Sequence, residues 1–208
     1  MSIVYNTKPT VSLREFIPRV QAAIDGVDVE MAAQYIADAA ITFARSTRIL
    51  RETICVELIS CQDSYRLDTP YRIIEVVSVR RHEGDNCGFA GQYNPNLQAY
   101  VDDGVLYLDP IPTDANAGSV IEIEVAMVPA RNAVELPETL YEDWVEAVVQ
   151  LALSQLYLLA DTPWYSLGAS REQHAWYKQS VISAKMANMT KHKPLNVRLS
   201  PRRIRGRR

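Results

Sequence analysis

Apolar residues recur at helical spacing through the first fifty residues of the chain. Ser12 begins Ser-Leu-Arg-Glu, a capping-box pattern, and this predicts a helix over residues 13–24 with a kink at Pro18. Asp28 is the expected N-cap of a second helix that ends near Arg48. The apolar residues of the second helix predict one buried face, and they are Met31, Ala32, Tyr35, Ile36, Ala39, Ala40 and Phe43.

The pattern changes at about Arg51, where short β-rich runs replace the helical spacing. Asp103-Gly104 separates two of the runs and suits the tight turn of a hairpin. In the last run, apolar residues alternate with glutamates, which predicts a strand with one wet face. We expect a small antiparallel β-region with a long exposed loop over residues 83–95. Its strands are expected at residues 53–59, 71–81, 99–101, 105–108 and 120–128.

The helical spacing returns at Leu136. Carboxylates occupy the opening turns of this third helix, where the helix dipole favours negative charge. Residues 144–160 are apolar almost all round, which predicts a central helix covered by the N-terminal helices. A fourth helix is expected from about Ser170. It presents two neighbouring groups of apolar residues, Tyr177, Val181 and Ala184 beside Ile182, Met186 and Met189.

This order of elements predicts the fold class and the domain organisation. We expect an α+β fold, mainly α: a four-helix bundle with an inserted small antiparallel β-region and an extended basic C-terminal arm. Residues 1–50 and 132–190 form the helical bundle domain, residues 51–131 the inserted β-rich domain, and residues 191–208 the arm. The composition is that of a folded soluble protein, since 48% of the 208 residues are hydrophobic and 23% are charged.

Charge is divided unevenly between the arm and the rest of the chain. The last 18 residues carry eight Lys and Arg and no acidic residue, whereas residues 1–190 hold 14 basic and 25 acidic residues, a net charge of −11. Such a dense run of like charge predicts that the arm contacts a partner. Residues 51–130 hold 13 acidic and five basic residues. A surface of this charge repels DNA and would suit a conduit through which DNA slides.

The arm has two parts that suit contact with a partner. Leu195, Val197 and Leu199 alternate with polar residues between Pro194 and Pro201. An extended segment would place these three side chains together, with its backbone free to join the edge of a partner's sheet. The arginines that follow can pair bidentately with carboxylates or phosphates. A solvated tail without a partner is the alternative interpretation.

Neither a metal site nor a membrane span is expected. The histidines have no further ligand at a recognised spacing, and the cysteines form no Cys-x-x-Cys pair. The N-terminus lacks the pattern of a secretory signal, and the most apolar stretch is shorter than the roughly 20 residues of a membrane helix. Synthesis in a reducing cytoplasm is expected. The residues considered are His82, His174, His192, Cys55, Cys61 and Cys87.

Paired carboxylates are the best candidates for catalytic chemistry in the sequence. Hydrolysis of a sugar bond needs a carboxylic acid held in an apolar pocket, whereas these pairs are expected on a turn and on a solvated strand face. The segment from Gly88 to Gly91 has the spacing of a nucleic-acid clamp but lacks basic residues and flanking helices. We therefore expect no enzymatic activity, no catalytic residue and no cofactor. The carboxylate pairs are Asp102 with Asp103 and Glu122 with Glu124.

Several segments follow one another in a distinctive order. Ala-Ile-Thr-Phe-Ala-Arg-Ser-Thr-Arg at residues 40–48 precedes the β insertion, and Leu136-Pro-Glu-Thr-Leu-Tyr-Glu-Asp-Trp-Val145 opens the apolar helix. Ala-Asp-Thr-Pro-Trp164, the Trp176-Tyr177 pair and the basic arm follow. In this order, over nearly the whole chain, the sequence resembles the head-to-tail adaptor proteins, also called head completion or connector proteins, of short-tailed, podovirus-like bacteriophages.

The resemblance implies a structural virion protein without enzymatic activity. Such adaptors form a ring, usually of twelve copies, between the portal protein and the tail nozzle at the head-tail junction. Double-stranded DNA passes through the channel without specific recognition, and assembly takes place in the host bacterial cytoplasm. The C-terminal extension typically reaches along the portal. The candidate portal-binding residues are therefore Lys191, Lys193, Leu195, Val197, Leu199, Arg202, Arg203, Arg205, Arg207 and Arg208.

Two other functions remain as alternatives. A nucleic-acid-binding protein could grip phosphates with the arm, although the arm has no aromatic residue among its basic ones to stack on bases. A cell-wall hydrolase of the tail is the second alternative, because some phage adaptors have been assigned this activity. No pair of acid and nucleophile in the sequence favours it.

Overall fold

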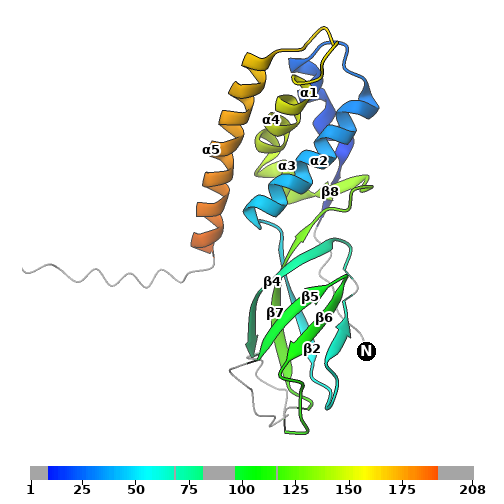
Figure 1. Ribbon diagram of the computed structural model, residues 1–208, viewed down its shortest axis with the longest axis vertical. Helices are drawn as coiled ribbons and strands as arrows, with labels where there is room; N and C mark the ends of the chain where they lie inside the picture. The colour runs from blue at the N-terminus through cyan, green and yellow to red at the C-terminus, as the bar shows by residue number, and fades with distance from the viewer. Residues whose placement is uncertain (1–8, 68, 82–96, 116, 192–208) are drawn as a thin grey trace, which may run out of the picture.

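The computed structural model describes residues 9–67, 69–81, 97–115 and 117–191. Figure 1 shows an elongated molecule with the helices at one end and most of the strands at the other. The elements are β1 (Thr10–Ser12), the 3-10 turn η1 (Leu13–Phe16), α1 (Ile17–Ala23), α2 (Val29–Thr47), β2 (Arg51–Glu57), β3 (Ser64–Arg66), β4 (Arg72–Arg81), β5 (Gln98–Asp102), β6 (Val105–Asp109), β7 (Val120–Val128), β8 (Glu135–Pro137), α3 (Glu138–Glu142), α4 (Val145–Leu156) and α5 (Leu167–Lys191).

The prediction of a mainly helical four-helix bundle with a small β-region is wrong. The described residues form five α-helices and eight strands in three antiparallel sheets, and strands make up 27% of them, so the fold is α+β with a substantial β part. The helix expected from Leu136 is interrupted because Trp144 leaves the helical conformation, with φ −134° and ψ 17°. The helix expected over residues 13–24 is also divided: η1 precedes α1, and Pro18 lies in the first turn of α1, where its missing N–H costs nothing.

Two three-stranded sheets share the hydrophobic core of the β end. Their strand orders are β2-β7-β4 and β3-β6-β5. The buried side of β7 is as predicted, because Ile121 and Ile123 are fully buried in the same cluster as Leu106 of β6. The predicted wet face is wrong, because no residue of this strand is exposed. The predicted hairpin is confirmed: β5 and β6 are joined through Asp103 and Gly104, both at positive φ. The loop expected over residues 83–95 lies outside the described residues.

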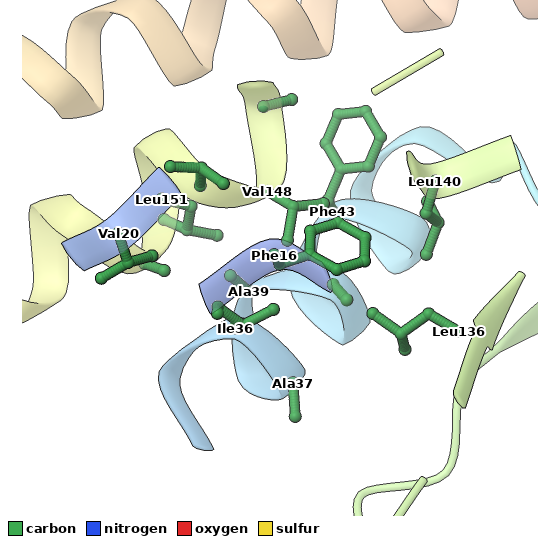
Figure 2. Close-up of a cluster of buried hydrophobic side chains, with 14 of the residues drawn as sticks. Phe16, Val20, Ile36, Ala37, Ala39, Phe43, Leu136, Leu140, Val148 and Leu151 are labelled. Carbon is green, nitrogen blue, oxygen red and sulfur yellow. The ribbon is translucent and has the colours of Figure 1, made fainter. Parts of the chain in front are cut away.

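The helical end has a separate core centred on α4. This helix packs against α1, α2 and α5, which confirms that the N-terminal helices cover it. Figure 2 shows Phe16, Phe43 and Val148 among the side chains that converge there. The ring of Phe43 lies 5.6 Å from the ring of Trp144 and 6.3 Å from that of Tyr177, so aromatic contacts join α2 to α5 and to the start of α4.

A two-stranded sheet, absent from the sequence prediction, closes the helical end. Val11 of β1 pairs with Leu136 of β8 in antiparallel register. Each strand has only three residues, too few for a recognisable alternation of apolar and polar positions. The pairing places the start of the chain beside the segment that returns from the β end, next to α3.

Candidate functional site

The candidate portal-binding residues fall almost wholly outside the described residues. Lys191 is the last residue of α5. The structure does, however, describe the base from which the arm leaves the body, which is the last turns of α5. The candidates that lie outside the described residues are Lys193, Leu195, Val197, Leu199, Arg202, Arg203, Arg205, Arg207 and Arg208.

Asn188 holds the end of α5 against the end of α2. Its side-chain amide donates hydrogen bonds to the carbonyl oxygens of Thr47, at 3.1 Å, and Arg48, at 2.9 Å. These carbonyls belong to the last turn of α2, where a helix has no backbone donors of its own to offer. Asn188 is buried and lies one turn before Lys191. The body therefore fixes the point at which the arm begins.

Arg48 extends this connection into the β end. It ends α2 in the left-handed conformation, with φ 54°, and its N–H donates to the carbonyl of Ala44. Its guanidinium pairs with the carboxylate of Glu75 in β4 at 2.7 Å. Both side chains are partly exposed, so the pair contributes less than about 1 kcal/mol. Arg48 is thus bound both by Asn188, which belongs to the helical end, and by Glu75, which belongs to the β end.

A groove of about 600 Å³ lies at this junction between the two ends. Charges of both signs are matched along it, so it is no basic site for an anion such as a phosphate group. Its charged lining residues are Arg45, Arg48, Arg72, Glu75, Asp102 and Asp103.

The paired carboxylates lie in two different surroundings. Asp102 and Asp103 are exposed at the turn between β5 and β6, as expected. Glu124 on β7 is not solvated as expected, because its side chain is only 13% exposed. Its carboxylate accepts hydrogen bonds from Arg51 and from the Ser78 hydroxyl, each at 3.2 Å. These charged and polar partners differ from the apolar pocket that surrounds the catalytic acid of a glycoside hydrolase.

The remaining candidates for chemistry form no cluster in the described part of the chain. No group of three or more His, Cys, Asp or Glu side chains comes together there as a metal site would require. His174 is exposed on α5, with its ring 5.9 Å from that of Tyr177. The pKa of the Cys55 thiol is raised, mainly because the thiol is partly desolvated by its neighbours and to a lesser extent because of the negative charge of Glu122. The reactive thiolate is therefore disfavoured. The candidates outside the described residues are His82, Cys87, the segment 88–91 and His192.

One flank of α5 carries a seven-residue repeat that the sequence analysis missed, and its first three residues, Arg171, Ala175 and Lys178, line a groove beside α4. Three basic side chains alternate with three apolar ones, and all six are exposed. Ile182 and Met189 are 59% and 68% exposed, whereas Tyr177 and Ala184 are buried, so the two apolar groups of this helix face different ways. The equal spacing of the three basic residues is the signal that could have revealed it. We call these six residues the outer stripe: Arg171, Ala175, Lys178, Ile182, Lys185 and Met189.

A second surface feature lies on the other side of the helical end. A groove of about 710 Å³ runs between α2 and η1 with α1, and the loop before β8 closes it. Val29 and Val134 are 41% and 75% exposed at this groove. We call it the α1–α2 groove.

Comparison with known proteins adds no relative. No protein-family model matches this chain, and no curated protein sequence matches it. None of the helices in the described ranges combines the length and the apolarity that crossing a lipid bilayer requires.

Proposed function

We propose that the protein is a structural, non-enzymatic virion component that joins the portal of a short-tailed bacteriophage to its tail nozzle. Copies of the chain, twelve in the usual adaptor, form a ring at the head-tail junction, and the C-terminal arm docks on the portal. Double-stranded DNA passes through the ring. Assembly takes place in the cytoplasm of the host bacterium.

The observation that carries this proposal is the fixed base of the arm. A docked arm can position the body on a partner only if the chain leaves the body from a fixed point. Asn188 supplies that point, because it binds the last carbonyls of α2 directly before the arm begins. The aromatic contact between Tyr177 and Phe43 holds the middle of the same helix.

The distribution of charge supports the same function. The arm carries eight basic residues, which suit carboxylates on a portal surface, while the remainder of the chain has a net charge of −11. DNA affinity depends mainly on contacts between basic side chains and phosphates. A ring of acidic bodies therefore lets DNA pass without holding it.

Cryo-electron microscopy of the full chain, with and without the portal of its own virus, tests the proposal. We expect a ring on the portal with the arms along the portal surface, and no ring when the chain ends at Lys191. Two further variants separate the parts of the arm. Replacing Leu195, Val197 and Leu199 by Ala removes the apolar anchor, and replacing the arginines by Gln removes the charge. We expect both variants to dock more weakly than the wild type. Docking of the wild type and of the alanine variant should weaken further as salt is raised, whereas docking of the glutamine variant should not.

The same preparations test the two alternatives. If removal of residues 192–208 abolishes binding to DNA while portal association is unchanged, the arm is a nucleic-acid grip and the proposal is wrong. Cleavage of peptidoglycan by the purified full chain would identify a hydrolase instead.

A further inference from the structure

Helices α4 and α5 lie side by side, and a groove runs along each flank of the pair (Figure 1). The groove on one flank has a volume of about 510 Å³ and apolar walls formed by Leu151, Leu158 and Leu167. Arg171 and Lys178 line it as well, and no carboxylate of the described residues does. We call it the basic groove.

The groove on the other flank has the opposite charge. It has a volume of about 360 Å³, and Asp143 and Glu146 line it without any basic side chain of the described residues. Glu146 pairs with Arg19 of α1, whereas Asp143 and the preceding Glu142 are exposed. Trp176 of α5 is also part of the lining and is about half exposed. We call it the acidic groove.

The sequence separates the two charges within one pair of helices. Residues 132–170 hold six acidic residues and no basic one, whereas residues 171–191 hold four basic residues and one acidic residue. The outer stripe extends the basic flank from its groove toward the last turn of α5. Leu158 and Leu167 in the basic groove are about half exposed, as is Trp176 in the acidic one. Each flank therefore presents exposed apolar side chains beside charges of one sign, which suits a partner of the opposite sign.

The two flanks cannot meet within one chain. Trp176 and Lys178 are two positions apart on α5, so their side chains leave the helix in directions about 160° apart. Each flank can therefore reach the other only on a second copy. A contact between two different patches on neighbouring copies is head-to-tail, and its repetition closes a ring when the rotation between copies allows it.

We infer that the Trp176 flank of one copy docks on the basic groove of the next copy. The indole ring enters between Leu158 and Leu167 of the neighbour, and Asp143 faces Arg171. Tryptophan and arginine are the residues that most often dominate the binding energy of an interface. The inference rests on the proposed function, because it names the two surfaces that join the subunits of the proposed ring.

Two variants of the full chain remove the apolar part of the contact, one on each flank. Trp176→Ala removes the indole ring, and Leu158→Ala with Leu167→Ala removes the walls that receive it. All three side chains are about half exposed, so we expect both variants to retain cooperative thermal unfolding. Ile111→Ala, at an exposed apolar residue on the β end, is the matched control.

Sedimentation velocity distinguishes a head-to-tail contact from other contacts. We expect the wild type and the Ile111→Ala variant to form oligomers, and each flank variant alone to lose at least about tenfold in association constant. An equimolar mixture of the two flank variants retains one intact contact, between Trp176 of the leucine variant and the basic groove of the tryptophan variant. The mixture should therefore form a dimer and nothing larger.

Charge reversal gives a second, independent test. Glu142→Lys with Asp143→Lys should weaken association, as should Arg171→Glu with Lys178→Glu. A mixture of these two variants again brings opposite charges together at every contact, so association should be restored. This rescue also serves if the alanine variants fail to fold.

The control for charge reversal is Glu57→Lys with Asp63→Lys, at two exposed carboxylates of the β end. This change should leave association as in the wild type. Equal losses in the control and in the flank variants would overturn the inference, as would mixtures no more associated than their components. So would a wild type that stays monomeric at a subunit concentration of about 1 mM, where even a weak specific contact is half formed.

Binding to the portal separates this inference from the proposed function. A ring on the portal that survives all the flank substitutions would reject the inference and leave the proposed function intact. Association of the two flanks without any binding to the portal would do the reverse.

Discussion

Asn188 donates a hydrogen bond from its side-chain amide to the carbonyl of Thr47 at 3.1 Å, although 141 residues separate the two in sequence. Thr47 is the last residue of α2, and Arg48, the second acceptor, begins the passage to the β end. One buried amide therefore joins the helix that carries the arm to the junction of the helical and β ends.

Asn188→Ala should destabilise the fold. The substitution removes the donor from the buried carbonyl of Thr47 and from the part-buried carbonyl of Arg48, which still accepts from Nε–H of Arg51 at 3.1 Å. The unmade bond at Thr47 dominates the cost, which is about 1–3 kcal/mol in the free energy of unfolding. Urea unfolding followed by circular dichroism measures the change. Ser183→Ala, on an exposed position of the same helix, is the control and should change stability by less than about 0.5 kcal/mol. Equal effects of the two substitutions would show that the Asn188 hydrogen bonds contribute nothing.

Phe43→Ala should be among the most destabilising substitutions in the helical end. Phe43 is fully buried, and its ring contacts those of Trp144 and Tyr177. Removal of such a ring leaves a cavity and costs about 3–5 kcal/mol. Tryptophan fluorescence during urea unfolding measures the loss. Thr42→Ala, at the exposed neighbouring position, is the control, and a loss below about 1 kcal/mol for Phe43→Ala would contradict the central place of this ring.

Two glycines should respond to alanine in opposite directions. Gly104 has φ +76° in the turn between β5 and β6, so Gly104→Ala should destabilise by about 1–2 kcal/mol through strain in a left-handed conformation. Gly168 lies in α5 with open space around it. Gly168→Ala should stabilise by up to about 1 kcal/mol, because alanine favours a helix. Differential scanning calorimetry compares the two variants, and a shift of the same sign and size in both would refute the turn geometry.

Stability should decline at alkaline pH in part because of Tyr177. Burial raises the pKa of Tyr177 above its usual value, and a hydrogen bond with Ser46 only partly opposes this. The folded protein holds the phenolic proton more tightly than the unfolded chain. This contribution to stability is therefore complete below a pH of about 10 and is lost as the pH rises further.

Thermal unfolding of the wild type and Tyr177→Phe between pH 9 and 11.5 measures that contribution. We expect a shallower decline in the variant, since phenylalanine has no proton to lose. Some decline should remain, because burial also raises the pKa of Tyr65 and of Tyr71. Tyr100→Phe, at an exposed tyrosine, is the control. Identical pH dependence in wild type and Tyr177→Phe would exclude Tyr177 as a source of the effect.

The sequence by itself determined the features that depend on near neighbours. Asp28 and Arg48 mark the ends of α2 as expected, because a cap and a left-handed terminus act within one helical turn. The turn at Asp103-Gly104 and the burial of every second residue over the first part of β7 are also local, and both appear in the structure. The basic composition of the arm is likewise readable from the chain alone.

Only the tertiary structure decided what depends on distant partners. Trp144, where the expected helix is interrupted, packs against Phe43, and Val11 pairs with Leu136. Each of these contacts joins segments more than a hundred residues apart. The same holds for the Asn188 hydrogen bonds and for which apolar residues of α5 are buried. Periodicity shows that a helix has an apolar face, but packing against α4 and α2 decides that Tyr177 is covered and that Ile182 is left exposed.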